Sequence, residues 1–202
     1  MFLRRRQFDL PGGAPAHYGQ SDAGARSRAD VDARAGGKQL TDREPDFRIA
    51  HLADHPWLIP DVAQSQQREF GHFGAVSIDE RMRRLGSALN TNRLPVSLVA
   101  LDASGTLLGS ASLLAQTITH PHLTPWLSTM VVAPRHRRRG IASALALRAQ
   151  AEAATMGFRV LHLFTERSEA LYARLGWARI DDATVAGRPV VVMRACVSSF
   201  SG

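Results

Sequence analysis

The chain has 202 residues, 45% hydrophobic and 21% charged, a balance typical of a soluble globular protein with one ordinary domain and an appendage. Its apolar stretches are too short to cross a bilayer, and no apolar segment follows the basic residues at the N-terminus, so we expect neither a membrane span nor a secretory signal. The formal net charge of +7 favours an anionic partner such as nucleic acid or a phosphorylated cofactor, and the single cysteine, Cys196, excludes an internal disulfide and fits a reducing cytoplasm.

The first 45 residues differ in composition from the rest. They are rich in glycine and proline, alternate arginine with aspartate, and contain few large apolar residues. Such a segment buries too little surface to offset the entropy of ordering it. We therefore predict a disordered tail over 1–45 and one folded domain over 46–202.

The first half of the domain predicts a strand, two helices and a strand pair. Alternating residues predict a strand over 47–52, and loosely helical spacing of apolar residues predicts a helix within 56–73. Ser77 and Glu80 form a capping box, which predicts that a second helix begins there. After it, the sequence predicts strands over 95–101 and 106–114, joined by the turn Asp102–Gly105 as a hairpin.

The second half alternates strands and helices. It predicts, in order, a strand over 126–132, a helix over 141–156, a strand over 158–164, a short helix over 168–175 and strands over 177–180 and 189–194. Gly157 and Gly176 are expected to end the two helices, and Ser168 to cap the second one. The resulting order, βααβββαβαββ, indicates an α/β domain without internal repeats.

The loop before the helix over 141–156 combines small residues with arginines. Gly140 and Ala142 let backbone amides at a helix N-terminus approach a ligand closely, and the helix dipole favours an anion there. Arg137, Arg138 and Arg139 add positive charge at the same place. The loop therefore suits a pyrophosphate.

Other interpretations of this loop exist. The dinucleotide-binding motif GxGxxG and the phosphate loop ending in Gly-Lys-Ser/Thr are both absent. The run Arg135–Arg139, interrupted only by His136, could bind nucleic acid, although it lacks aromatic residues that stack on bases. A solvated charged turn explains the run alone about as well as a phosphate site does.

Two motifs at a suitable separation favour the phosphate site. The pattern Arg137-x-x-Gly140-x-Ala142, after a strand ending in Val-Ala-Pro, resembles the acyl-CoA motif of the GNAT superfamily of N-acyltransferases. Residues 171–177 (LYARLGW) resemble its second landmark, a short helix with a tyrosine that ends in Leu-Gly-aromatic. The likeness covers about residue 46 to the end. Within the superfamily, the chain is similar to a bacterial branch with the stretches LLGSASL, TPWLS and LYLFT, which correspond here to residues 107–113, 124–128 and 161–165 (LHLFT). The likeness implies a central mixed β-sheet with helices on both faces.

The resemblance also implies acetyl-CoA as co-substrate, direct attack by a primary amine, and neither a protein nucleophile nor a metal. Backbone groups of Met130, Val131 and Val132 would face the pantetheine arm and the thioester carbonyl. The pyrophosphate would be held by Arg137, Arg138, Arg139, Gly140, Ile141 and Ala142. Thr165 stands where many relatives carry an asparagine that contacts the cofactor, and Ser168 could take over that contact.

By the same resemblance, Tyr172 is the general acid that protonates the departing thiolate. The alternative is that Tyr172 only packs its ring on the core. The strand over 126–132 lacks the carboxylate that many relatives use as general base. His120 and His122 are candidates because their pKa suits that role, and a water chain or an amine arriving as the free base is the alternative.

We therefore predict a cytoplasmic acetyl-CoA-dependent N-acetyltransferase, a monomer or homodimer, with an unidentified amine acceptor and no membrane or nucleic-acid partner. The acceptor site would be lined by residues 56–90 and 115–125. Candidate contributors are Trp57, Glu69, His72, Trp126 and Trp177. An acyl-CoA-binding regulatory protein without turnover, or a nucleic-acid-binding module using Arg135–Arg139, are the alternative hypotheses.

Overall fold

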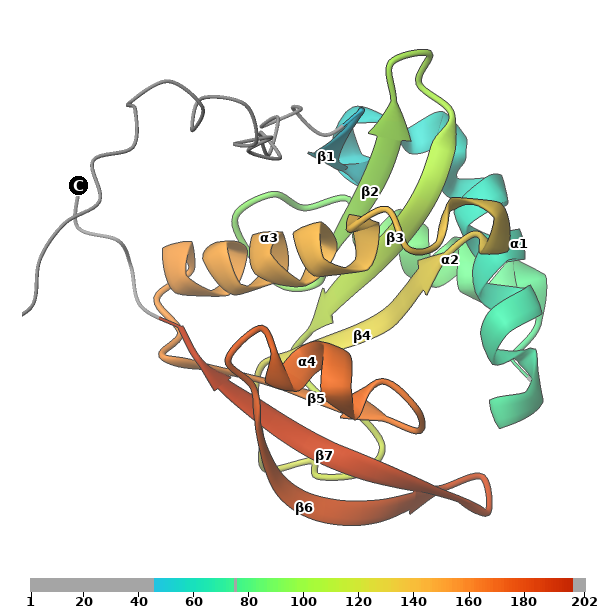
Figure 1. Ribbon diagram of the computed structural model, residues 1–202. Coiled ribbons are helices and arrows are strands. Elements are labelled where there is room, and N and C mark those ends of the chain that lie inside the picture. The colour runs from blue at the N-terminus through green and yellow to red at the C-terminus, as the bar shows by residue number, and fades with distance from the viewer. Residues whose placement is uncertain (1–45, 75, 198–202) are drawn as a thin grey trace, which may run out of the picture. The chain divides into compact units, whose positions relative to one another are not determined.

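The computed structural model describes residues 46–74 and 76–197, so the predicted tail over 1–45 lies outside the described part (Figure 1). Seven strands form one sheet in the order β1-β2-β3-β4-β5-β7-β6. The strands are β1 Phe47–His51, β2 Val96–Asp102, β3 Leu107–Leu114, β4 Trp126–Val132, β5 Val160–Thr165, β6 Ala178–Val185 and β7 Arg188–Cys196. Only β4 and β5 pair in parallel, and every other neighbouring pair is antiparallel.

In the part of the chain that the structure describes, four α-helices accompany the sheet: α1 Ile59–Phe70, α2 Ile78–Ser87, α3 Ile141–Thr155 and α4 Glu169–Ala173. Short 3-10 turns lie at Leu52–Asp54, Pro56–Leu58, Gly71–Phe73 and Pro134–His136. The order of strands and α-helices is therefore βααβββαβαββ, which confirms the prediction. Among the helices of the described residues, none is both long enough and apolar enough to cross a membrane.

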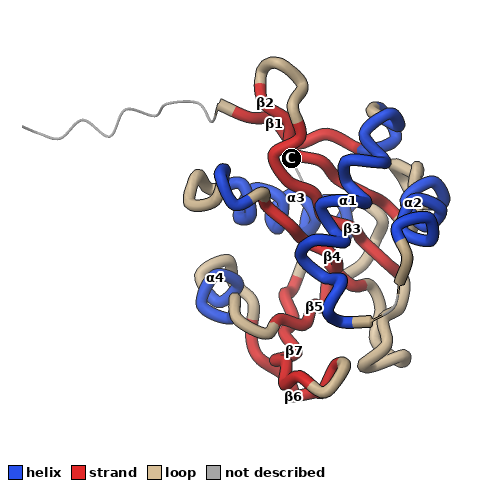
Figure 2. The backbone as a smooth tube through the Cα atoms, turned by 90° about the vertical axis from the view of Figure 1, so that its right-hand side faces the viewer, coloured by secondary structure: helices blue, strands red, loops and turns tan. Residues whose placement is uncertain are grey.

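The alternation of side chains along β2 shows why helices cover both faces of the sheet. Val96, Leu98 and Ala100 belong to the apolar cluster that includes buried residues of α3. Their neighbours Val99 and Leu101 belong to a second cluster, built with α1 and α2. Successive strand residues point to opposite faces, so one strand supports both layers. In Figure 2, α2 and α3 lie on opposite sides of the strands.

Local chemistry explains most of the predicted boundaries. The Ser77 side chain accepts a hydrogen bond from the Glu80 N–H at 3.2 Å, which confirms the cap of α2. Gly157 adopts φ 85°, a left-handed conformation that ends α3 where expected. α4 spans Glu169–Ala173 and is therefore shorter than the helix predicted over 168–175.

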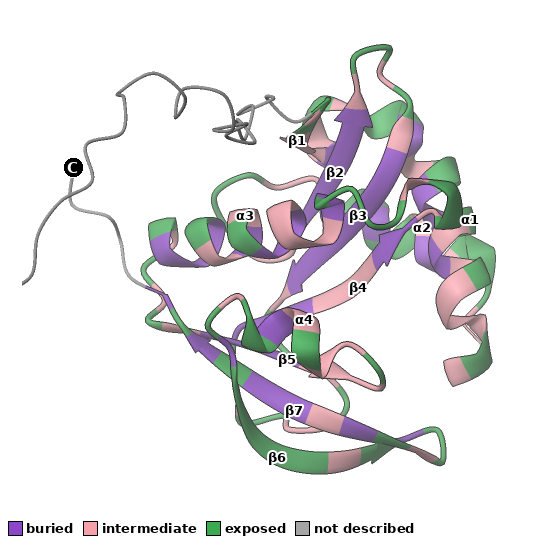
Figure 3. Cartoon of the chain, viewed as in Figure 1, coloured by how far each residue is buried: buried purple, intermediate pink, exposed green. Residues whose placement is uncertain are grey.

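The C-terminal hairpin is longer than predicted. β6 extends to Val185 and turns into β7 through Ala186 and Gly187, whose φ values of 49° and 76° are typical of a tight hairpin turn. β6 lies at the edge of the sheet, and most of its residues are exposed (Figure 3). An exposed edge strand lacks the apolar alternation from which strands are predicted, which explains the short prediction.

A β-bulge interrupts β4 in the middle of the sheet. Ser112 pairs with Ser128 and Ser110 with Val131, so Thr129 and Met130 together face the single residue Ala111. Thr129 has φ 45°, which is uncommon for a residue other than glycine. A bulge bends its strand and increases the local twist, so β4 changes direction at this point.

Just after the bulge, β3 and β4 approach so closely that only glycine fits at position 109. A Cβ atom there would lie 2.7 Å from the Val131 carbonyl oxygen and 3.2 Å from Cγ2 of Val132. Since the first contact is with backbone, a larger residue would push the strands apart where β4 leaves the bulge.

Gly109→Ala is therefore expected to lower the free energy of unfolding by about 1–3 kcal/mol, as overpacking does in a buried site. Urea denaturation measures the change. Gly86→Ala is the control, because nothing lies within 4 Å of its added Cβ and Gly86 is inside α2. That substitution should stabilise the protein by about 0.5–1 kcal/mol through helix propensity. Equal effects of the two substitutions would contradict the close approach.

Candidate active site

The two parallel strands of the sheet separate almost as soon as they meet. β4 and β5 pair only through Trp126 and His162, next to a hydrogen bond of 3.0 Å from the His162 N–H to the Pro125 carbonyl. The following residues of both strands line one cavity of about 500 Å³. The bulge at Thr129 and Met130 lies further along β4, and its bend increases the separation of the two strands.

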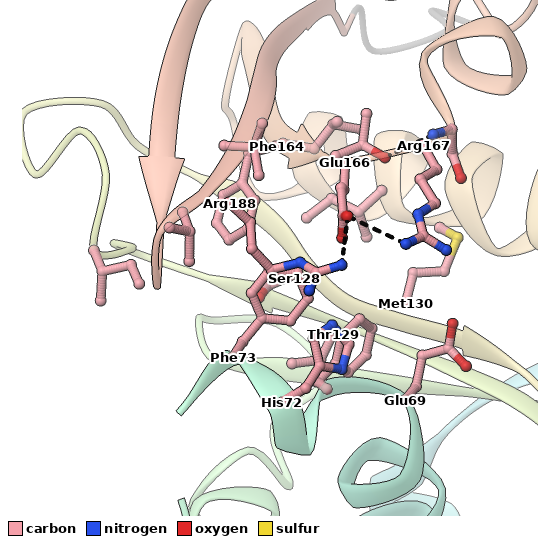
Figure 4. Close-up of a pocket in the computed structure, with 18 of the residues that line it drawn as sticks. Glu69, His72, Phe73, Ser128, Thr129, Met130, Phe164, Glu166, Arg167 and Arg188 are labelled. Carbon is pink, nitrogen blue, oxygen red and sulfur yellow. Dashed lines mark hydrogen bonds and ion pairs between the residues drawn. The ribbon is translucent and has the colours of Figure 1, made fainter. Parts of the chain in front are cut away.

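The cavity is lined by several separate parts of the chain. From the diverging strands come Leu127, Ser128, Thr129, Met130, Leu163, Phe164 and Thr165. The end of α1 and the turn after it contribute Glu69, Phe70, His72 and Phe73, and α2 contributes Arg81. The segment after β5 adds Glu166, Arg167, Ser168 and Tyr172, and the last hairpin adds Val185, Arg188 and Val190. In Figure 4, Glu69, His72 and Phe73 lie across the cavity from Glu166 and Arg167.

Tyr172 lines this cavity from α4 and also packs on the core. The residue is 7% exposed, and its ring makes an edge contact with Trp177 at 5.8 Å between centroids. Within the described residues, its hydroxyl donates to one group, the sulfur of Met130 at 3.5 Å, which is a weak acceptor. Burial raises the pKa of Tyr172 to about 12, so the hydroxyl carries its proton at neutral pH.

Thr165 and Ser168 also line the cavity, in an arrangement that differs from the predicted one. Ser168 precedes α4, but its side chain makes no capping hydrogen bond, so the predicted cap is wrong. Instead, the Thr165 hydroxyl accepts a hydrogen bond from the Ser168 N–H at 3.0 Å. Thr165 therefore holds the turn between β5 and α4 beside the cavity.

The loop between β4 and α3 has the predicted helix start. Arg138 and Gly140 have φ values of 64° and 80°, and the Ala144 N–H bonds to the Gly140 carbonyl at 3.0 Å. The amides just before Ala144 lie in the first turn, where no intrahelical acceptor is available. Ile141 is buried and anchors the helix start in the core, and Ala142 packs beside it.

The arginines of this loop have partners of different kinds. Arg137 donates through Nε to the Val132 carbonyl at 3.1 Å and through Nη2 to Glu69 at 2.9 Å. Arg139 pairs with Asp46 and bonds to Nδ1 of His136 at 3.0 Å. The run is therefore partly neutralised by acidic residues.

The remaining predicted residues on β4 have different environments. Met130 lines the cavity, whereas Val131 and Val132 are 4% and 8% exposed and do not line it. Both pair with β3, and the Val132 carbonyl receives Arg137. β4 thus joins the cavity wall to the arginine loop.

Comparison with known proteins identifies the family. The family model of the acetyltransferase (GNAT) family matches residues 59–177, more than half of the chain. The chain belongs to the GNAT acetyltransferase family. Among curated proteins, none matches the chain significantly.

Solved structures share this GNAT fold. A spermidine N-acetyltransferase from Vibrio cholerae, in complex with CoA and spermine, is 18% identical with a TM-score of 0.58 and covers 78% of this chain and 99% of its own. An aminoglycoside 6'-N-acetyltransferase complexed with coenzyme A is 15% identical with a TM-score of 0.61, covering 77% and 99%. The Salmonella typhimurium protein YncA, with its cofactor acetyl-CoA, is 18% identical with a TM-score of 0.61, covering 78% and 97%. At these identities the likeness concerns the fold.

The two histidines predicted as candidate bases lie outside the cavity. His120 and His122 do not line the cavity, and Nε2 of His120 contacts Asp181 on β6 at 3.1 Å. The distance between the His120 and Trp126 ring centroids is 6.3 Å, so this loop packs against the start of β4. The structure thus does not support either histidine as a base in the cavity.

Some of the residues predicted to contact the acceptor line the cavity, and the others do not. Glu69 and His72 line the cavity, as expected. Trp57 is 67% exposed and outside it, while Trp126 and Trp177 are buried in the core.

Two cavity features were not predicted from the sequence. The first is the pair of Glu166 and Arg188, which are joined by a hydrogen bond of 2.7 Å that lowers the pKa of Glu166 (Figure 4). The Arg188 guanidinium also lies 5.7 Å from the ring centre of Phe73. The second is Arg81, which is buried although it belongs to a charged stretch of α2. Within the described part of the chain, no cluster of His, Cys, Asp and Glu side chains could hold a metal ion.

Proposed function

We propose that this GNAT protein is an N-acetyltransferase that transfers an acetyl group from acetyl-CoA to a primary amine. The observation that carries the proposal is the cavity between β4 and β5, with Tyr172 in its wall and a helix N-terminus near the end of β4. Family membership supports the type of reaction. Relatives of the same fold that were crystallised with CoA or acetyl-CoA support the donor.

The residues of the cavity and the loop fit this donor. Apolar side chains such as Leu127, Leu163 and Phe164 suit the pantetheine arm, and Met130, Val131 and Val132 would offer it backbone groups. Thr165 and Ser168 would flank the arm on the other side. The diphosphate would be held by Arg137, Arg138, Arg139, Gly140, Ile141 and Ala142, where free amides and the helix dipole favour an anion.

In this proposal the protein needs no nucleophile of its own. Acetyl-CoA supplies the acyl group as an activated thioester, and the amine attacks it directly. Tyr172 protonates the departing thiolate. Burial raises the pKa of Tyr172, and it would also raise the pKa of the CoA thiol in the same cavity. The proton donor and the thiolate that accepts the proton would therefore shift in the same direction. Positioning and backbone polarisation of the carbonyl supply the rest of the rate.

Neither carboxylate of the cavity is free to serve as a base for the acceptor proton. Glu69 forms an ion pair with Arg137, and the hydrogen bond from Arg188 lowers the pKa of Glu166. We therefore infer that the amine enters as its free base, and that the proton its nitrogen loses on forming the amide returns to the Tyr172 phenolate, directly or through water.

Donor binding is tested at Gly140 with two variants of equal shape. Asp and Asn both tolerate a left-handed conformation, so Gly140→Asp and Gly140→Asn strain the loop alike. The carboxylate of Gly140→Asp repels a phosphate, so its Kd for acetyl-CoA should be at least about tenfold weaker than that of Gly140→Asn, a difference of ~1.4 kcal/mol. Isothermal titration calorimetry measures both. Equal affinities would contradict the proposed phosphate site.

The role of Tyr172 is tested by removing its hydroxyl alone. Tyr172→Phe should lower kcat about 100-fold or more, since general acid catalysis contributes that much, and leave the Kd for acetyl-CoA nearly unchanged. The melting temperature should change little, because the hydroxyl makes only the weak contact to Met130. Tyr18→Phe, at the only other tyrosine, is the control. Unchanged kcat in Tyr172→Phe would exclude the acid role.

A further inference from the structure

The charged groups of the cavity are unevenly paired. Both of its carboxylates have arginine partners: Glu69 binds Arg137 at 2.9 Å, and Glu166 binds Arg188 at 2.7 Å and Arg167 at 3.4 Å. Arg81 also lines the cavity, yet no carboxylate among residues 46–74 and 76–197 forms an ion pair with it. The cavity wall thus presents a cation without a counter-charge.

Arg81 is held in place by packing and by one hydrogen bond. The residue is 8% exposed, between α1 and α2, and its Nε donates to Oε1 of Gln67 at 2.7 Å. Burial lowers the pKa of the Arg81 guanidinium, and the like charge of Arg84 lowers it further. An arginine keeps its proton even so, and an unpaired buried charge is costly. An anion that binds there would recover part of that cost.

The chemistry of the guanidinium indicates which anion fits. Because Nε is already bonded to Gln67, the two terminal nitrogens remain, and they form a flat fork that matches the two oxygens of a carboxylate. Arg81 by itself balances a single negative charge, while Arg167 and Arg188 share the Glu166 carboxylate. Resting on the proposed function, we propose that the acceptor is an amine that carries a carboxylate, and that Arg81 binds this carboxylate.

The same arrangement disfavours two other ligands. A polyamine would bring a second ammonium group into a cavity where both carboxylates are occupied and an unpaired guanidinium repels it. The phosphates of the donor belong to the loop over 137–142, whose residues do not line this cavity. Arg81 therefore acts on the acceptor, even though a spermidine N-acetyltransferase shares the fold.

The test compares amines that differ only in the anion. Initial rates with acetyl-CoA are measured for α-amino acids, β-alanine and γ-aminobutyrate against their amides, and for phosphoethanolamine against ethanolamine. Spermidine is measured alongside them as a polyamine. For at least one pair, the carboxylate should raise kcat/KM about 10- to 100-fold, as expected for a charge-assisted hydrogen bond. Arg81→Gln should remove this preference mainly through KM and leave the Kd for acetyl-CoA unchanged. Arg84→Gln, an exposed position on the same helix, is the control and should keep the preference.

A second measurement uses only the wild-type protein, in case Arg81→Gln does not fold. N-acetylated amino acids should inhibit competitively with the amine, and their amides should inhibit at least about tenfold more weakly. The inference is overturned if acetyl-CoA binds but amides react and inhibit as well as carboxylates, or if the phosphate or polyamine substrates are preferred. Absence of acetyl-CoA binding would instead overturn the proposed function.

Discussion

The separation of β4 from β5 determines where the site can form. The two strands pair only at Trp126 and His162, and β4 bends further on, where Thr129 and Met130 face a single residue of β3. A closed parallel pair would fill this space with ladder hydrogen bonds and leave no cavity. The bulge is supported on both sides, by Gly109 of β3 and by Gln66 of α1, whose side chain donates to the Thr129 hydroxyl at 3.3 Å. The uncommon backbone of Thr129 is thus stabilised by its neighbours, as expected of strain at a functional site.

Arg137 connects the two halves of the proposed reaction. It touches the carbonyl at the end of β4 and the Glu69 carboxylate at the edge of the cavity. An anion bound to the loop would compete with Glu69 for this guanidinium. Acetyl-CoA binding would then change the charge of the acceptor cavity, and the acceptor would meet a different electrostatic environment once the donor is bound.

The sequence predicts the parts of the molecule that depend on local chemistry. The strand-helix order, the cap at Ser77, the helix end at Gly157 and the helix start after Gly140 follow from periodicity and from residues with special backbone preferences. Motif resemblance brings Met130, Thr165, Ser168 and Tyr172 to one place, and the structure lines one cavity with all four.

The rest depends on contacts between distant segments. Nothing local marks the bulge at Thr129, since it results from the register of β3 against β4. Glu166 meets Arg188 only because the last hairpin folds back beside β5. Arg81 stands among charged residues that are typical of an exposed helix face, and only the packing of α1 on α2 buries it. The sequence does not show which partner a loop histidine meets, and the fold brings His120 to Asp181.

Hydrogen exchange with and without acetyl-CoA tests the central claim that the divided strands and the helix start form one donor site. If these segments form one donor site, amide exchange slows in both, at residues 128–132 beside the bulge and at residues 138–143 at the start of α3, and changes little in the β6–β7 hairpin. Binding that protects only one of these segments, or that protects residues remote from both, would contradict it.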